Sequence, residues 1–224
     1  MSLLRRIDEI IAERSLLKHP FYEMWSAGEL SAESLAGYSK EYFQLVKAVP
    51  SFMDTIMEAA PDSESVNREL AENRREEADH IGPWLEFAGE LGVSEPELAG
   101  YAGLPKTRQA VHEMGCLMGA AGFDAGAAAM YAFEKEIPLV SQTKLDGLAS
   151  FYGMAGERAT RYFELHTEAD IRHAALWRRI IENSDAAAHP DGEQASVLED
   201  TASKSVSAQN LLLDACYEEY CRPR

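Results

Sequence analysis

The side chains best suited to chemistry in this chain are three residues in its last third, His166, Asp170 and His173. If the segment is helical, spacings of four and three residues place two imidazoles and one carboxylate on a single face. Glu77 and His80 repeat the combination three residues apart. Helix-borne Glu-x-x-His pairs that meet inside a bundle are how all-helical proteins build two-metal carboxylate sites. Iron chemistry is therefore the first hypothesis.

Glu134 completes the candidate ligand set. It follows the small-residue segment 125–130, which has the composition of a buried helix, where an unpaired carboxylate would be costly. The six residues offer three imidazoles and three carboxylates, which suit two iron ions or an iron–manganese pair with open positions for dioxygen. The alternative is a charged helix face with incidental histidines. Thr167-x-x-Asp170 also fits a capping box, which would start a helix there.

The elements that must position these residues are predicted to be helices throughout. Apolar residues recur at helical spacing, and prolines and capping residues divide the chain into about seven or eight helices in one domain, 1–224. This all-α prediction leaves no strand. The main predicted helices are 31–60 with a kink at Pro50, 64–91, a stretch that begins at Pro105 and leads to Glu134, 143–153, 157–183 and, after a polar loop at 184–192, 193–220.

Composition limits the classes of partner. The 224 residues carry a formal charge of −17, which disfavours nucleic acids and anionic membranes as partners. No apolar stretch approaches the ~18 residues of a membrane span, and the first residues do not have the pattern of a signal peptide. The three cysteines form no disulfide framework. A reducing cytoplasm is the predicted location.

Several tyrosines and one lysine are further candidates for a role near the metals. For each of them, ordinary core packing or surface exposure is the alternative. Most helical tyrosines are expected to pack in the core with the hydroxyl at a wet edge. Tyr162 lies one turn before His166 and could face the metals. Lys144 has the pattern of a surface lysine. Cys116 is expected to be a small core residue.

Five blocks of the sequence resemble a known family. They are 19–30, 38–42, 124–126, 131–138 and 162–173, and the last is the most specific. With these blocks the chain resembles the heme-oxygenase-like di-iron oxidases, and within them the relatives of the chlamydial death-domain-associating protein, cousins of the TenA and PqqC proteins. The resemblance covers most of the chain and implies a heme-oxygenase-like helical bundle.

The resemblance also implies a ligand set and an activity. The family's metal ligands fall on the six residues already named, although relatives place several more residues between the first Glu and its His. Close relatives resemble 4-aminobenzoate synthases that excise one of their own tyrosines, take nitrogen from a lysine and activate dioxygen at the metals. The residues that match are Tyr22 as the sacrificed tyrosine, Lys144 as the nitrogen source, and Tyr38 and Tyr162 near the site. Phe133 replaces a further family tyrosine.

Other functions remain open at this point. The metal centre could act catalytically on a small amine, amino acid or fatty acid that enters the same cavity, or the chain could be a metal-free protein-binding module with an acidic surface. A TenA-type thiaminase would need a cysteine where 127–130 has only Ala and Met. The resemblance implies an external reductant and a homodimer.

Overall fold

The computed structural model describes residues 1–222, and all regular secondary structure among them is helical. This confirms the predicted all-α class. The first half contains α1 (Leu3–Glu13), the 3-10 helix η1 (Leu16–Lys18), α2 (Pro20–Ala27), α3 (Ala32–Val46), α4 (Val49–Glu58), α5 (Glu64–Asp79), α6 (Ile81–Glu90) and α7 (Glu95–Gly100). The second half contains α8 (Pro105–Gly119), α9 (Phe123–Glu134), α10 (Ile137–Ser150), α11 (Glu157–Glu182), α12 (Asp185–Ala188) and α13 (Glu193–Tyr220).

Two of the predicted long helices are each divided, so the structure has more separate segments than the seven or eight predicted. The predicted helix 31–60 becomes α3 and α4, and Pro50 lies in the first turn of α4 rather than at a kink. A proline is tolerated there because the first turn of a helix has no partner for its N–H groups. The predicted helix 64–91 is divided at His80, which ends α5 and precedes α6.

Two other boundaries differ from the prediction, and one alternative is excluded. Helix α10 begins at Ile137 rather than near residue 143, because Pro138 occupies its first turn and favours a helix start. The predicted polar loop 184–192 contains the short helix α12. Helix α11 is continuous through Thr167, whose hydroxyl donates to the Glu164 carbonyl, so the alternative of a capping box at this position is wrong.

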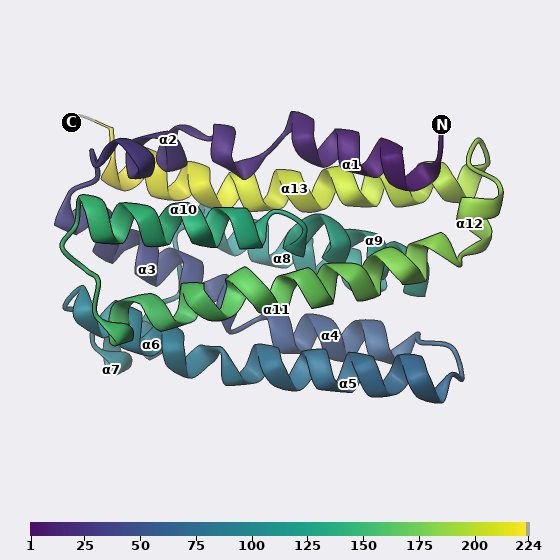
Figure 1. Cartoon of the computed structure of the whole chain (residues 1–224), viewed down its shortest axis with the longest axis horizontal. Helices are drawn as coiled ribbons and strands as arrows, with labels where there is room; N and C mark the ends of the chain where they lie inside the picture. The colour runs from purple at the N-terminus through teal and green to yellow at the C-terminus, as the bar shows by residue number, and fades with distance from the viewer. Residues whose placement is uncertain (223–224) are drawn as a thin grey trace.

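The helices pack around α9, the most deeply buried element. Every residue from Ala125 to Glu134 is buried. Small side chains permit the close packing: a Cβ added to Gly126 would lie 2.9 Å from the Met118 carbonyl oxygen. Helix α9 packs between α11 on one side and α13 with α8 on the other, while α10 also packs on α11 (Figure 1). Helices α4 and α5 lie side by side along the lower edge of the bundle (Figure 1).

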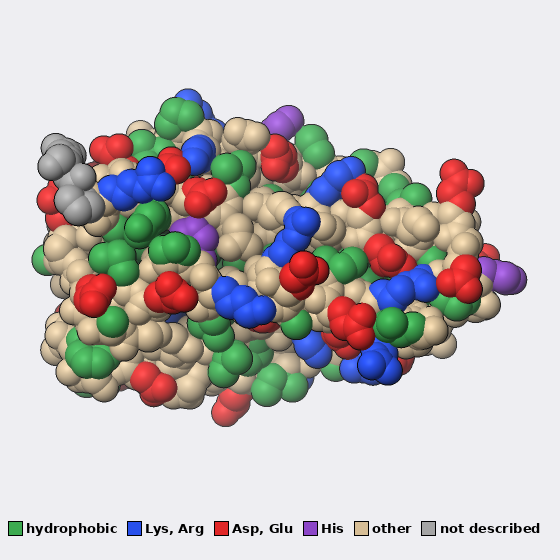
Figure 2. Space-filling view, turned by 90° about the horizontal axis from the view of Figure 1, so that it is seen from above, with side chains coloured by type: hydrophobic (Ala, Val, Ile, Leu, Met, Phe, Trp, Pro, Cys, Tyr) green, Lys and Arg blue, Asp and Glu red, His purple; other side chains and the backbone are tan. Residues whose placement is uncertain are grey.

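The exterior carries charge of both signs. On the face shown in Figure 2, acidic and basic side chains are interspersed among polar and apolar ones. None of the helices among residues 1–222 combines the length and apolar character needed to cross a lipid bilayer.

Candidate metal centre

Three helices bring the six predicted ligands together. Glu77 comes from α5, His80 from the junction of α5 with α6, Glu134 from the last turn of α9, and the remaining three from α11. They form two groups in which the ligand atoms all lie within 4.8 Å of one another, and all six side chains are buried. One group is Glu77, His80 and His166, and the other is Glu77, Glu134, Asp170 and His173. Glu77 belongs to both groups, as a bridging carboxylate between two cations would.

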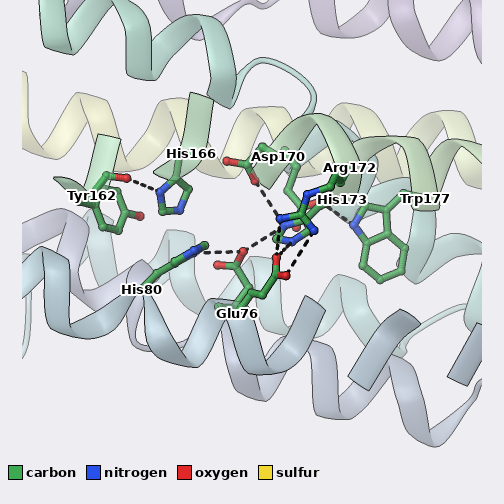
Figure 3. A network of polar contacts seen from close by, with 10 residues as sticks. Glu76, His80, Tyr162, His166, Asp170, Arg172, His173 and Trp177 are labelled. Atoms are coloured by element: carbon green, nitrogen blue, oxygen red, sulfur yellow. Dashed lines mark hydrogen bonds and ion pairs between the residues drawn. The ribbon is translucent and has the colours of Figure 1, made fainter. Parts of the chain in front are cut away.

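Helix geometry explains why each element presents its ligands on the inner face. Along α11, the spacings of four and three residues keep His166, Asp170 and His173 on one side of the helix, toward α5 (Figure 3). At the end of α5 the spacing of three places His80 Nδ1 3.6 Å from Glu77 Oε1. The helical spacings seen in the sequence therefore produce convergent side chains.

Unpartnered polar atoms test whether these residues fit a metal. Seven buried side-chain nitrogen and oxygen atoms among the described residues have no hydrogen-bond partner. Five belong to the candidate ligands, and the other two are the amide atoms of Asn73, one turn before Glu77. Each such atom destabilises a fold by roughly 1–3 kcal/mol unless something binds it. A cation at this point would satisfy all five, so the donor set fits a metal ion. The five atoms are Glu77 Oε1, His80 Nδ1, Glu134 Oε1, Asp170 Oδ2 and His173 Nδ1.

The ionisation of the cluster is strongly perturbed by burial and by its own charges. Burial lowers the pKa of His173, but the nearby carboxylates of Asp170 and Glu77 outweigh it and raise the pKa to about 11. Burial alone would raise the pKa of Glu77, yet its contacts with His173 and His80 hold it below the usual range. Burial and the neighbouring carboxylates raise the pKa of Glu134. Without a cation, protons on His173 and Glu134 therefore offset part of the negative charge of the buried carboxylates.

Two contacts outside the six ligands orient them. The ring of His166 points Nδ1 at the Tyr162 carbonyl oxygen, 2.6 Å away, which leaves Nε2 free (Figure 3). The indole N–H of Trp177 donates to Glu134 Oε2 at 2.6 Å and leaves Oε1 without a partner (Figure 3). Partners of this kind fix the orientation of metal ligands. Trp177 was not among the residues predicted from the sequence, although it follows His173 by one helical turn.

Lys144 is buried, and the prediction of a surface lysine is wrong. Its residue exposure is 2%, because α10 turns it toward the bundle interior. The ammonium nitrogen lies over four aromatic rings, at 4.8 to 5.4 Å from their centroids, and burial lowers the pKa of the amine to about 7. The four rings, which together we call the aromatic box, belong to Tyr42, Phe163, Tyr38 and Tyr22.

The tyrosines predicted near the site are buried rather than at a wet edge. The hydroxyls of Tyr22 and Tyr38 are 3.4 Å apart, and the ring of Tyr162 stacks on His166 with centroids 4.1 Å apart. Burial raises the pKa of Tyr22, Tyr38 and Tyr162, which keeps the phenols neutral. Tyr42, which the sequence did not single out, is the ring nearest to the Lys144 nitrogen, at 4.8 Å.

A small internal cavity separates the aromatic box from the metal ligands. Its volume is about 10 Å³, close to one water-sized probe. Tyr42 lines it from the side of the box, and Glu77, His166 and Asp170 line it from the side of the ligands. Phe133 and Tyr162 also line the cavity. The lysine and tyrosine cluster and the ligand cluster are therefore neighbours in one buried interior. Cys116, by contrast, is exposed, so its predicted place in the core is wrong.

The fold and this site define an all-helical protein with a buried cluster of histidines and carboxylates. Comparison with known proteins identifies its family. A domain from Shewanella denitrificans described as having a heme oxygenase-like fold superposes with a TM-score of 0.77, covering 97% of this chain and 91% of that one at 14% identity. That likeness confirms the fold alone. The family model TENA/THI-4/PQQC matches residues 4–218, and the chain belongs to this family.

Sequence relatives carry a functional name. A protein of Nitrosomonas europaea called 4-aminobenzoate synthase is 33% identical over 229 residues, covering 97% of this chain and 92% of that protein. A protein of Chlamydia muridarum with the same name is 35% identical over 188 residues, covering 81% of this chain and 78% of its own length. The predicted resemblance to chlamydial relatives is confirmed by these matches.

Proposed function

We propose that this protein is a 4-aminobenzoate synthase that makes its product from its own side chains, with Tyr22 as the source of the ring and Lys144 as the source of nitrogen. The observation that carries the proposal is the position of Lys144, buried in a box of aromatic rings that includes Tyr22 and Tyr38. The box adjoins the ligand cluster, and the relatives carry this functional name.

The six ligands would hold two iron ions or an iron–manganese pair, and Glu77, which belongs to both groups of ligands, would be within reach of either ion. When bound, such ions bind and activate dioxygen, which supplies the oxidising power. An external reductant would supply the electrons that dioxygen reduction needs beyond those taken from the protein. The acidic and histidine donors and their unpartnered atoms support this part of the proposal.

The size of the cavity favours an internal substrate. A volume of about 10 Å³ holds roughly one water molecule, whereas pockets for drug-sized ligands measure roughly 300–1,000 Å³. A free aromatic or fatty substrate does not fit inside this cavity. Tyr22, Tyr38 and Lys144 are already buried in the aromatic box, which reaches this cavity through Tyr42, and their burial shields reactive groups from solvent.

The protonation state of Lys144 suits a nitrogen donor. An amine can form a new carbon–nitrogen bond only through its unprotonated form. Burial lowers the pKa to about 7, so a large fraction of the amine is neutral at physiological pH. The aromatic rings hold the amine 5.4 Å from the ring centroid of Tyr22, and the Tyr38 hydroxyl lies 3.4 Å from that of Tyr22. Lys144 would act as the nucleophile, while Tyr38 would hold the phenol in place.

The structure of the product indicates which bonds change. In 4-aminobenzoate the amine is para to the carboxyl group, as the hydroxyl of tyrosine is para to Cβ. The ring and Cβ of Tyr22 would therefore become the ring and carboxyl carbon. The Cα–Cβ bond of Tyr22 and the Cε–Nζ bond of Lys144 would break, the phenol oxygen would leave as water when C–N replaces C–O, and dioxygen would be the oxidant that converts Cβ to the carboxyl group. One protein molecule would then yield one product molecule, and the protein would be consumed.

Isotope labelling tests the proposal. Protein grown with ¹³C-tyrosine and ¹⁵N-lysine is loaded anaerobically with Fe(II), given a chemical reductant and exposed to oxygen, and 4-aminobenzoate is analysed by mass spectrometry. We expect seven ¹³C atoms and one ¹⁵N atom in the product. Tyr22→Phe should abolish it, and the control Tyr131→Phe should not, because Tyr131 is buried but donates to Asp8 of α1 instead. Unlabelled product, or full yield from Tyr22→Phe, would contradict the proposal and favour an external substrate.

A further inference from the structure

The two ring nitrogens of His173 face different surroundings. Nδ1 points inward, 3.2 Å from Glu77 Oε1 and 3.7 Å from Asp170 Oδ1. Nε2 points away from the other ligands and lies 2.8 Å from Oε2 of Glu76, a residue outside the ligand set (Figure 3). Only Nδ1 is therefore directed at the place where a metal would bind.

Glu76 is itself held in place. The guanidinium of Arg172 approaches both of its carboxylate oxygens, at 3.2 Å from Oε1 and 3.1 Å from Oε2 (Figure 3). A two-point contact of this kind fixes the plane of a carboxylate as well as its position. Glu76 belongs to α5 and Arg172 to α11, so the pair also joins the two helices that carry most of the ligands. The groove outside the pair, with a volume of about 580 Å³, is lined by both residues and by His80.

The contact decides which nitrogen of His173 keeps its hydrogen. An ionised carboxylate only accepts hydrogen bonds, so Nε2 must carry the hydrogen that Glu76 accepts. The lone pair offered to a cation is then on Nδ1, which has no hydrogen-bond partner. His166 shows the opposite arrangement, because the Tyr162 carbonyl oxygen engages its Nδ1. The two histidines of α11 thus present different nitrogens to the cluster.

We propose that Glu76, held by Arg172, is a positioning residue that fixes His173 as an Nδ1 metal ligand. The inference rests on the metal centre of the proposed function and extends it to two residues outside the ligand set. The glutamate does not touch the metal. It sets the ring orientation and the position of the hydrogen, and its negative charge strengthens the imidazole as a donor. Removal of such a partner typically weakens metal binding about 10- to 100-fold.

The chain offers a matched control between the same two helices. Glu69 of α5 pairs with Arg179 of α11 at 2.6 Å, two helical turns further along, and contacts no histidine. Glu69→Ala removes an ion pair between the helices without touching a ligand. Glu76→Ala removes both the ion pair and the hydrogen bond to His173. Glu76→Gln retains an oxygen that can accept from Nε2 but lacks the charge.

The test is anaerobic titration of the metal-free protein with Co²⁺, followed through its visible absorption bands, with Fe²⁺ competition for affinity. We expect Glu76→Ala to weaken binding about 10- to 100-fold and to shift the cobalt bands. Glu76→Gln should recover part of the affinity, and Glu69→Ala should match wild type in both measurements. Circular dichroism of each variant checks that the helices remain folded, and Glu76→Gln serves alone if the alanine variant does not fold.

Three results would overturn the inference, and they are distinguishable. If wild type binds cobalt and Glu76→Ala, or Glu76→Gln where it serves alone, binds it with the same affinity and bands, Glu76 does not position His173 and the metal centre stands. If wild type binds neither cobalt nor iron, the proposed function and this inference fail together. An equal loss in Glu69→Ala and Glu76→Ala would also refute it, because the effect would then come from the helix pairing.

Discussion

Replacement of Lys144 by methionine tests the lysine on which the proposed chemistry depends. Methionine has nearly the same length, is flexible and apolar, and can fill the space inside the aromatic box. In wild type, by contrast, the Lys144 amine is either deprotonated or buried as a charge among four aromatic rings, where the residue is 2% exposed. Both states destabilise the folded protein. We therefore expect Lys144→Met to be more stable than wild type at neutral pH.

The magnitude follows from the pKa. A lysine ordinarily has a pKa of 10.5, and burial lowers that of Lys144 to about 7. Between these two values the unfolded chain binds a proton that the folded protein does not, so the stability of wild type rises with pH across this range. At ~1.4 kcal/mol per pKa unit, the penalty is about 4 kcal/mol at pH 7 and about 2 kcal/mol at pH 9. The stability advantage of Lys144→Met should thus shrink by about 2 kcal/mol from pH 7 to pH 9.

Urea unfolding of the metal-free proteins at the two pH values measures this difference. The packing of methionine adds a constant that is independent of pH, so the change with pH isolates the titration of Lys144. The control Lys204→Met, on an exposed lysine of α13 paired with Asp200, should show no such change. If the difference in free energy of unfolding between Lys144→Met and wild type stays constant from pH 7 to pH 9, the amine remains charged in the folded protein. It would then be unable to act as the nitrogen nucleophile.

Two further substitutions test the packing that holds the site. The carboxylate of Glu41 is fully buried and accepts from Thr107, the Leu104 N–H and two tyrosine hydroxyls, so Glu41→Ala should lower the free energy of unfolding by about 3 kcal/mol. Its thermal midpoint should fall by about 10 °C, whereas an unchanged midpoint would mean that water replaces the carboxylate. Gly147→Ala would place a Cβ 2.5 Å from Trp25 Nε1, whose N–H donates to the Lys144 carbonyl oxygen. This substitution should lower the free energy of unfolding, measured in urea, by about 1–3 kcal/mol. Gly89→Ala, with its nearest neighbouring atom at 3.8 Å, should not destabilise the protein; equal losses in the two variants would contradict this account.

The part of the site that could be predicted from the sequence is the part encoded by helical spacing. His166, Asp170 and His173 converge because residues four and seven apart share a helix face whatever surrounds the helix. Glu134 could be expected in the interior because small apolar residues precede it, and it is 1% exposed. These inferences depend on local rules, which hold before the rest of the chain is placed.

The part that could not be predicted depends on contacts between distant segments. Lys144 has the pattern of a surface residue because no neighbouring residue in sequence reveals the rings of α2, α3 and α11 that cover it. Glu76 has the pattern of a solvated acid, and only the approach of α11 shows that it engages His173. Trp177 likewise becomes a partner of Glu134 only when α9 and α11 pack together. A sequence pattern identifies ligands on one helix, but not the residues that orient them from another.

The short Glu77–His80 spacing shows how local helix geometry alone can bring two candidate ligands together. Here the backbone of His80 stays in the helical region at φ −72° and ψ −16°, and its N–H donates to the Glu76 carbonyl oxygen. Three residues along a helix return a side chain to nearly the same face, so His80 Nδ1 remains 3.6 Å from Glu77 Oε1. The helical backbone thus brings the two side chains together, and the three-residue spacing is compatible with both residues as ligands of one centre.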